Sequence, residues 1–164
     1  MGLEPLTNDD WGFESNCFVC EARNPDGLRI PFAYDTDRDL VVAVFTLGSE
    51  HSGAPAWVHG GVSLAICDEA MAWAAIASRK KWGVTRDLQA TFERPVKIDT
   101  TYRIEARITA GDDGELQSEA AILDERDKVR VRTTATLVVY SAVNAPEMIG
   151  SELPDSLRTY LREP

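Results

Sequence analysis

The longest apolar stretch of the chain, residues 62–79, contains no proline or glycine and is rich in good helix formers. Its apolar residues fall on every side of a helix rather than along one stripe, so we expect protein to surround most of it. A run of this length could also cross a bilayer, but two adjacent acids, Asp68 and Glu69, lie near its middle with no basic residue beside them. The pattern predicts a buried core helix that carries two carboxylates.

Segments with strand character lie on both sides of this helix. Before it, residues 28–34 and 40–46 are separated by a polar turn and predict a hairpin. After it come four long segments without another helix, 85–98, 101–110, 115–124 and 128–140. Alternation of apolar and polar residues is clear in the second and fourth of these, and short turns join the last three. We therefore expect a meander of long antiparallel strands.

Such a meander has one apolar face to bury, and the chain offers only one helix able to cover it. We predict an α+β fold in which a curved antiparallel sheet wraps around one long central helix. That helix should end at 80–83, where two lysines suit the helix dipole and Gly83 suits a left-handed cap. We expect residues 1–16 to form an irregular or briefly helical lead-in. We expect residues 141–164 to form an extension that contains a short helix over 151–162.

Composition limits how many domains the chain can form and which kinds of partner it can bind. With 164 residues, 44% of them hydrophobic, the chain can form a single compact domain over 1–164. A net charge of −10 would repel nucleic acid and anionic membranes, so neither is expected as a general partner. The first residues are acidic where a signal peptide would be basic and then apolar, which predicts a cytoplasmic protein.

The three cysteines, Cys17, Cys20 and Cys67, are an odd number, which fits a reducing compartment better than a disulfide scaffold. The first two form a Cys-x-x-Cys motif, and the only histidines, His51 and His59, could by count complete a tetrahedral zinc site. Because the histidine spacing matches no zinc-finger pattern, ordinary packing of the cysteines is the preferred interpretation. The sequence predicts no metal and no cofactor.

A set of short motifs runs in order through the predicted core: His59-Gly60-Gly61, Asp68 nine positions after the histidine, Thr85-Arg86-Asp87-Leu88 and Phe92-Glu93-Arg94-Pro95-Val96. They are preceded by Cys17-x-x-Cys20 and Asn24-Pro25-x-Gly27-Leu28. Together they resemble the hotdog-fold acyl-CoA thioesterases of the phenylacetic-acid-degradation type and their thioesterase-superfamily relatives. The resemblance covers residues 17–140. It implies a hotdog fold, in agreement with the predicted architecture, and dimers or dimers of dimers with active sites between subunits.

The resemblance also implies a reaction, the hydrolysis of an acyl-CoA thioester to free acid and CoA. Gly60 and Gly61 would lie at the helix start, where unpaired N–H groups suit an oxygen that gains negative charge, and Gly60 would polarise the carbonyl. Asp68 would act as general base on water or attack directly, with Thr85 orienting the water. Asp68 lies about 10 to 12 Å along the same helix, so both groups can act on one carbonyl only across a twofold interface between two chains.

The two acids of the helix are expected to differ in role. Glu69 points about 100° away from Asp68 around the helix and should meet an arginine or solvent. The alternative for Asp68 is a structural carboxylate held by hydrogen bonds at a subunit interface.

Further residues are expected near the substrate. Relatives commonly place Asn or Gln upstream of His-Gly-Gly; here His51 and Ser52 stand there and could donate hydrogen bonds, or belong to a solvated loop. His59 is interpreted mainly as a cap that shapes the helix entry. The basic residues that could meet the phosphates of CoA are Arg79, Lys80, Lys81, Arg86 and Arg94, although each could also be ordinary surface charge.

The alternative function is a non-catalytic hotdog domain that binds acyl-CoA or serves as a structural partner. The unusual pair His51 and Ser52 is its best support. A hotdog hydratase fits less well, because those enzymes resemble a different arrangement of Asp and His on the helix.

Overall fold

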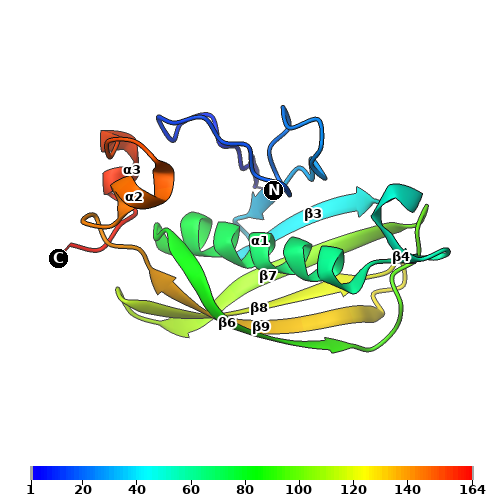
Figure 1. The fold of residues 1–164 in the computed structure, drawn as a ribbon. Coiled ribbons are helices and arrows are strands. Elements are labelled where there is room, and N and C mark those ends of the chain that lie inside the picture. Colours follow the sequence, from blue (N-terminus) through cyan, green and yellow to red (C-terminus); the bar gives the residue numbers. More distant parts are fainter. Residues whose placement is uncertain (1, 164) are drawn as a thin grey trace.

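A seven-stranded antiparallel sheet and one long helix organise the chain, of which the computed structural model describes residues 2–163 (Figure 1). Helix α1, Gly60–Arg79, packs against β3, β6, β7, β8 and β9. The strands lie in the order β1-β2-β3-β7-β8-β9-β6, with bounds Leu3–Pro5, Ala33–Asp35, Leu40–Thr46, Thr101–Gly111, Glu115–Leu123, Val129–Val139 and Gly83–Phe92. This arrangement confirms the predicted α+β fold of a sheet around one central helix.

The core lies between α1 and the sheet. Ile66, Ala70 and Met71 are fully buried on the helix, and Ile104, Ile122 and Leu137 are buried on the strands below them. By length and composition alone α1 is apolar enough to cross a membrane, as a core helix of this kind often is. Its apolar side chains instead pack on the strands, as the sequence predicted.

Helix α1 begins at Gly60, so both glycines lie at its start as predicted, but it ends on a different residue from the predicted cap. His59 Nδ1 accepts the N–H of Gly61 at 2.9 Å, which extends the helix through both glycines. At the other end Lys80 adopts the left-handed conformation, with φ of 53°, so the prediction that Gly83 would supply it was wrong. Gly83 is the first residue of β6, where an added Cβ would lie 3.1 Å from Leu137 Cβ.

Strand β6 departs from the predicted meander. Strands β7, β8 and β9 follow one another through short turns as expected, but β6 pairs with β9 and forms one edge of the sheet. The predicted strand 85–98 is β6 only as far as Phe92. Residues 93–100 then carry the chain across to β7, a connection long enough for the crossover that the short turns cannot make.

Both ends of the chain are more structured than predicted. The lead-in contains β1, which pairs with β2, while most of the predicted strand 28–34 is irregular. Trp11 stacks on Trp82 and touches Trp73 of α1 and Tyr160, so aromatic packing holds the lead-in, the helix and the C-terminal extension together. The extension holds two short helices rather than one, α2 at Ala145–Ile149 and α3 at Asp155–Arg158.

The remaining short elements form the loop before α1. They are the 3-10 turn η1, Ser49–His51, and a two-stranded ribbon of β4 and β5, Ser52–Ala54 and Trp57–Val58. In Figure 1 this loop lies at the end of the helix where α1 begins, opposite α2 and α3.

Candidate active site

Asp68 and Thr85 meet between α1 and β6. Asp68 is half-buried near the middle of the helix. Thr85 is the third residue of β6, the strand that runs beside the helix. The Thr85 hydroxyl donates to Asp68 Oδ1 at 2.5 Å. The structure therefore brings together two of the three residues predicted to be catalytic.

An irregularity in β6 gives Thr85 its direction. The register between β6 and β9 shifts between Thr85 and Asp87, so Arg86 is an extra residue without a partner on β9. Bulges of this kind bend a strand and redirect the side chains next to them. On the far side of the bulge, Asp87 accepts a hydrogen bond from Thr136 of β9, whereas Thr85 is left to bond the helix.

Only one of the two glycines at the helix start keeps a free donor. The N–H of Gly61 is taken by His59, so its predicted contact with substrate is not supported by this geometry. Those of Val62 and Ser63 bond the carbonyl of His59. Within residues 2–163 the N–H of Gly60 has no acceptor, and it stands at the positive end of the helix dipole.

Gly60 opens into a groove of about 350 Å³. A Cβ added to it would lie 3.4 Å from the ring of Phe92, so the aromatic ring marks the wall beside it. The groove is lined by Trp57, Val58, Gly60, Ser63, Phe92, Glu93, Arg94, Pro95 and Val96. It thus combines an apolar wall, a backbone donor and a cation.

The polar groups of the loop before the helix form hydrogen bonds within the loop and to His59. Ser52 Oγ donates to the carbonyl of Ser49 at 2.8 Å, and the carbonyl of His51 accepts the N–H of His59 at 2.9 Å. The backbone of Gly53 packs against His59, where a Cβ would lie 3.0 Å from its Cα. His51 and Ser52 are not among the residues that line the Gly60 groove. In the single chain the backbone of His51 holds the helix entry, and the Ser52 hydroxyl bonds within the loop.

The predicted phosphate-binding cations are spread over the molecule. Arg86 pairs with Glu115 at 2.7 Å, and Lys81 pairs with Asp113 at 3.0 Å. Arg79 likewise lies near an acid, Asp39, and Lys80 caps the helix. Arg94 alone of the five lines the Gly60 groove, and it forms no ion pair within the described part of the chain.

Glu69 has surroundings that sequence reasoning missed. Of the two expected surroundings, arginine or solvent, no arginine within residues 2–163 pairs with it, and its carboxylate lies with the thiols of Cys17 and Cys20. Burial and then the charge of Cys17 raise the pKa of Glu69 to about 7. Neither histidine belongs to this cluster. The available signal was the Cys-x-x-Cys motif together with an acid in an apolar helix.

The two parts of the predicted catalytic machinery lie apart in one chain. Gly60 and Asp68 are eight residues apart on α1, about 12 Å along its axis. Strand β6 runs beside the helix in the opposite direction, with Phe92 next to Gly60 and Thr85 next to Asp68. A single thioester carbonyl cannot touch both ends.

A sequence-family model matches the central part of this architecture. The sequence model of the thioesterase superfamily matches residues 57–112, which run from β5 through α1 and β6 to the end of β7. The matched segment therefore contains Gly60, Asp68 and Thr85. No curated protein sequence matches the chain.

Solved structures share the fold at low sequence identity. A thioesterase superfamily protein is 23% identical with a TM-score of 0.70, over 79% of this chain and 64% of that one. The PaaI protein of the E. coli phenylacetic acid degradation operon is 18% identical with a TM-score of 0.57, over 60% of this chain and 75% of that one. A hypothetical thioesterase from Streptococcus pneumoniae TIGR4, solved with coenzyme A, is 19% identical with a TM-score of 0.58, over 61% of this chain and 80% of that one. The chain is thus a hotdog-fold protein that matches the thioesterase superfamily over residues 57–112.

Proposed function

We propose that this protein is an acyl-CoA thioesterase that works as a homodimer, each site joining Gly60 of one chain to Asp68 of the other. Its superfamily suggests hydrolysis of acyl-CoA thioesters. The observation that supports the site most directly is the hydrogen bond from Thr85 to Asp68 Oδ1. The Asp68 carboxylate is half-buried and has no cation partner in the described chain.

Asp68 is placed to act as general base. Thr85 occupies Oδ1, and no described residue donates to Oδ2, which leaves that oxygen to accept a proton from water. The water oxygen then attacks the thioester carbon, the C–S bond breaks, and the CoA thiolate leaves as the acid forms. Direct attack by Oδ2 would give a mixed anhydride that water hydrolyses in a second step. Appearance of ¹⁸O in the Asp68 carboxylate after single turnover in H₂¹⁸O would identify direct attack followed by hydrolysis at the Asp68 carbon, because a general base does not exchange its oxygens.

Gly60 supplies the complementary group. Its unpaired N–H at the helix start can hold the carbonyl oxygen as negative charge develops on it. Trp57 and Phe92, which are 50% and 52% exposed, offer an apolar wall for the acyl group. Arg94 is available for a phosphate of CoA. The pneumococcal relative solved with coenzyme A supports this choice of substrate.

The edge of the sheet supports a dimer. Strand β6 ends the sheet with ten residues whose outer side pairs with no described strand, and its Val84 and Phe92 are exposed. On α1, two small residues flank Asp68, Ala65 one turn before it and Ala72 one turn after. A second copy related by a twofold axis would cover this edge and bring its own Gly60 groove toward Asp68.

A thiol-release assay tests the activity. We expect turnover of at least one member of a panel of aryl- and fatty-acyl-CoA esters by the purified protein. Binding of those esters without release of CoA would favour the non-catalytic alternative.

Mixing two inactive variants tests the shared site. Gly60→Pro and Asp68→Asn chains each disable one half, so every site in either homodimer is damaged. After subunit exchange, half the dimers are mixed and each holds one intact site, which should restore about a quarter of the wild-type rate. If exchange is demonstrated by native mass spectrometry and no activity returns, the site is not shared between chains.

A further inference from the structure

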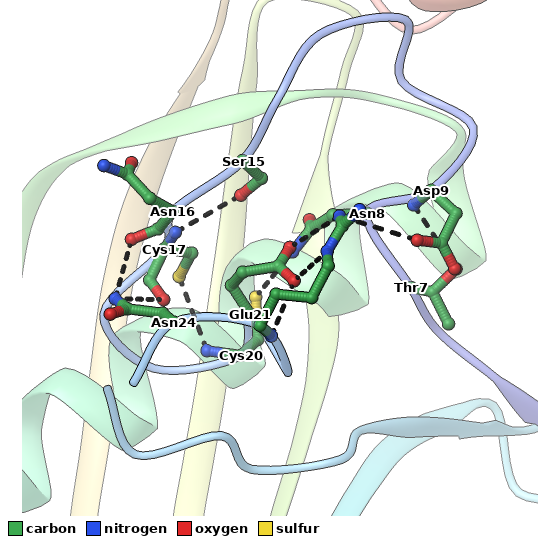
Figure 2. Close-up of polar contacts among 10 residues, drawn as sticks. Thr7, Asn8, Asp9, Ser15, Asn16, Cys17, Cys20, Glu21 and Asn24 are labelled. Atoms are coloured by element: carbon green, nitrogen blue, oxygen red, sulfur yellow. Dashed lines mark hydrogen bonds and ion pairs between the residues drawn. The ribbon is translucent and has the colours of Figure 1, made fainter. Parts of the chain in front are cut away.

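The Cys-x-x-Cys motif lies where the N-terminal segment crosses α1, and the proposed reaction makes no use of it. Cys17 and Cys20 are half-buried free thiols, and Glu69 reaches them from the helix. One ligand atom from each of the three lies within 4.8 Å of the others. Figure 2 shows both sulfurs inside the network of polar contacts that folds this segment, with the helix behind it.

Hydrogen-bond donors point at both sulfurs. The backbone N–H groups of Val19 and Cys20 point at Cys17 Sγ, at 3.4 and 3.5 Å. Asn8 Nδ2 donates to Cys20 Sγ at 3.3 Å (Figure 2). Donors of this kind commonly surround metal-bound ligands and hold them in direction.

Glu69 adds a carboxylate to the two thiols, and no cation within residues 2–163 pairs with it. Apart from burial, the groups that act on its carboxyl are the two thiols and Asp68. A carboxylate beside two sulfur atoms in a partly buried place is stabilised by a positive charge. A divalent cation would supply that charge at the point where the three ligand atoms converge.

We infer that Cys17, Cys20 and Glu69 bind one Zn²⁺, with water at the fourth tetrahedral position. Two sulfur ligands and one carboxylate suit zinc and disfavour Mg²⁺ or Ca²⁺, which prefer sites built from oxygen. Zinc–ligand bonds of about 2.0 to 2.3 Å place tetrahedral ligand atoms roughly 3.5 to 3.8 Å apart. The three atoms now lie within 4.8 Å of one another, so reaching this spacing requires movements of about 1 Å.

The outer network gives the site a structural role. Asn8 also contacts Glu21, which is only 4% exposed and is held by Arg23 at 2.7 Å. The ligands therefore join a preorganised loop to the helix, one residue from Asp68. The metal fastens the N-terminal segment onto α1 and takes no part in the proposed hydrolysis.

Metal content and cobalt substitution test the site. The full chain, purified with thiols reduced and oxygen excluded, should contain about one zinc per chain by elemental mass spectrometry. Replacement by Co²⁺ should give the visible bands of a tetrahedral complex and a near-ultraviolet thiolate-to-metal band. A chelator should lower the midpoint of thermal unfolding, and added Zn²⁺ should restore it.

Variants assign the ligands. Cys17→Ser and Cys20→Ser should each weaken the thiolate band and Co²⁺ binding, and Glu69→Gln should retain the thiolate band while affinity falls by about tenfold or more. Cys67→Ala is the matched control for removal of a thiol, because Cys67 is fully buried on the helix and faces Thr133 of the sheet. It should keep one metal per chain.

Three results would overturn the inference. The first is reduced wild-type protein that holds no zinc and develops no cobalt bands. The second is cobalt binding that is unchanged in Cys17→Ser. The third is a metal-free chain isolated under reducing conditions with Cys17 and Cys20 joined as a disulfide, which peptide mass spectrometry detects by the loss of two hydrogens.

Discussion

Asp68 and Glu69 are consecutive residues on α1, yet they belong to two different regions of the molecule. Asp68 faces β6, where the Thr85 hydroxyl donates to it, and no residue within 2–163 donates to its second oxygen. Glu69 faces the N-terminal segment, where two thiols surround its carboxylate. One step of about 100° around the helix separates these surroundings.

The difference teaches that the partner, more than the acid itself, decides what a buried carboxylate does. A single neutral hydroxyl orients Asp68 and leaves it one oxygen for substrate or water. Two thiols around Glu69 instead form a pocket of converging ligand atoms. The β6 face of the helix is suited to catalysis, and the face under the N-terminal segment is suited to holding a metal.

The largest expected effect contrasts the two acids directly. Asp68→Asn keeps the size of the side chain but removes the base, and kcat should fall about 100- to 10,000-fold. Glu69→Gln, the same change one residue away, should lower kcat much less, because its carboxylate does not face the reacting carbonyl. Steady-state thiol release by both variants measures the contrast. Equal losses would mean that the two faces do not divide catalysis from structure.

The next effect concerns the donor at the helix start. Gly60 is the first residue of α1, where proline is well tolerated, and His59 before it has φ and ψ of −59° and 133°, which proline permits. Gly60→Pro should therefore keep the helix, remove the N–H and lower kcat about 100- to 1000-fold. Gly60→Ala keeps the N–H and fits beside Phe92, so it is the control. A fully active proline variant with unchanged circular dichroism would remove this donor from the mechanism.

A smaller effect is expected for the residue that positions Asp68. Thr85→Val keeps the shape and removes the hydrogen bond, so kcat should fall about tenfold, or roughly 1.4 kcal/mol in barrier height. Thr85→Ser retains the hydroxyl and should recover most of the rate. A valine variant that loses no activity would show that Asp68 is held by its packing alone.

The smallest expected effect concerns the C-terminal end of α1 and not either of its two faces. Lys80 holds a left-handed conformation that costs a non-glycine residue about 1 kcal/mol. Lys80→Gly should relieve it and raise the midpoint of thermal unfolding by about 2 to 4 °C. Differential scanning calorimetry measures this shift, with Arg79→Gly as a control that should destabilise, because it places glycine inside the helix. A lower midpoint for Lys80→Gly would mean that the lysine side chain contributes more than its backbone costs.

Local sequence signals predicted much of this molecule. The apolar run without proline or glycine identified α1 to within two residues of its start, and strand 40–46 matches β3. Errors lie where long-range pairing overrides local pattern. Strand β1 is short and exposed and exists because β2 pairs with it, and β6 ends the sheet beside β9 because of a crossover that no local pattern encodes.

The sequence by itself determined that one helix is buried, that two acids lie in it and that a pair of glycines begins it, because residue spacing sets these features. Only the tertiary structure decided their partners: Thr85 for Asp68, the Cys17 and Cys20 thiols for Glu69, and His59 for the N–H of Gly61. Helix periodicity gives the direction of a side chain, whereas its neighbours come from segments distant in sequence whose position depends on the packing of the whole sheet.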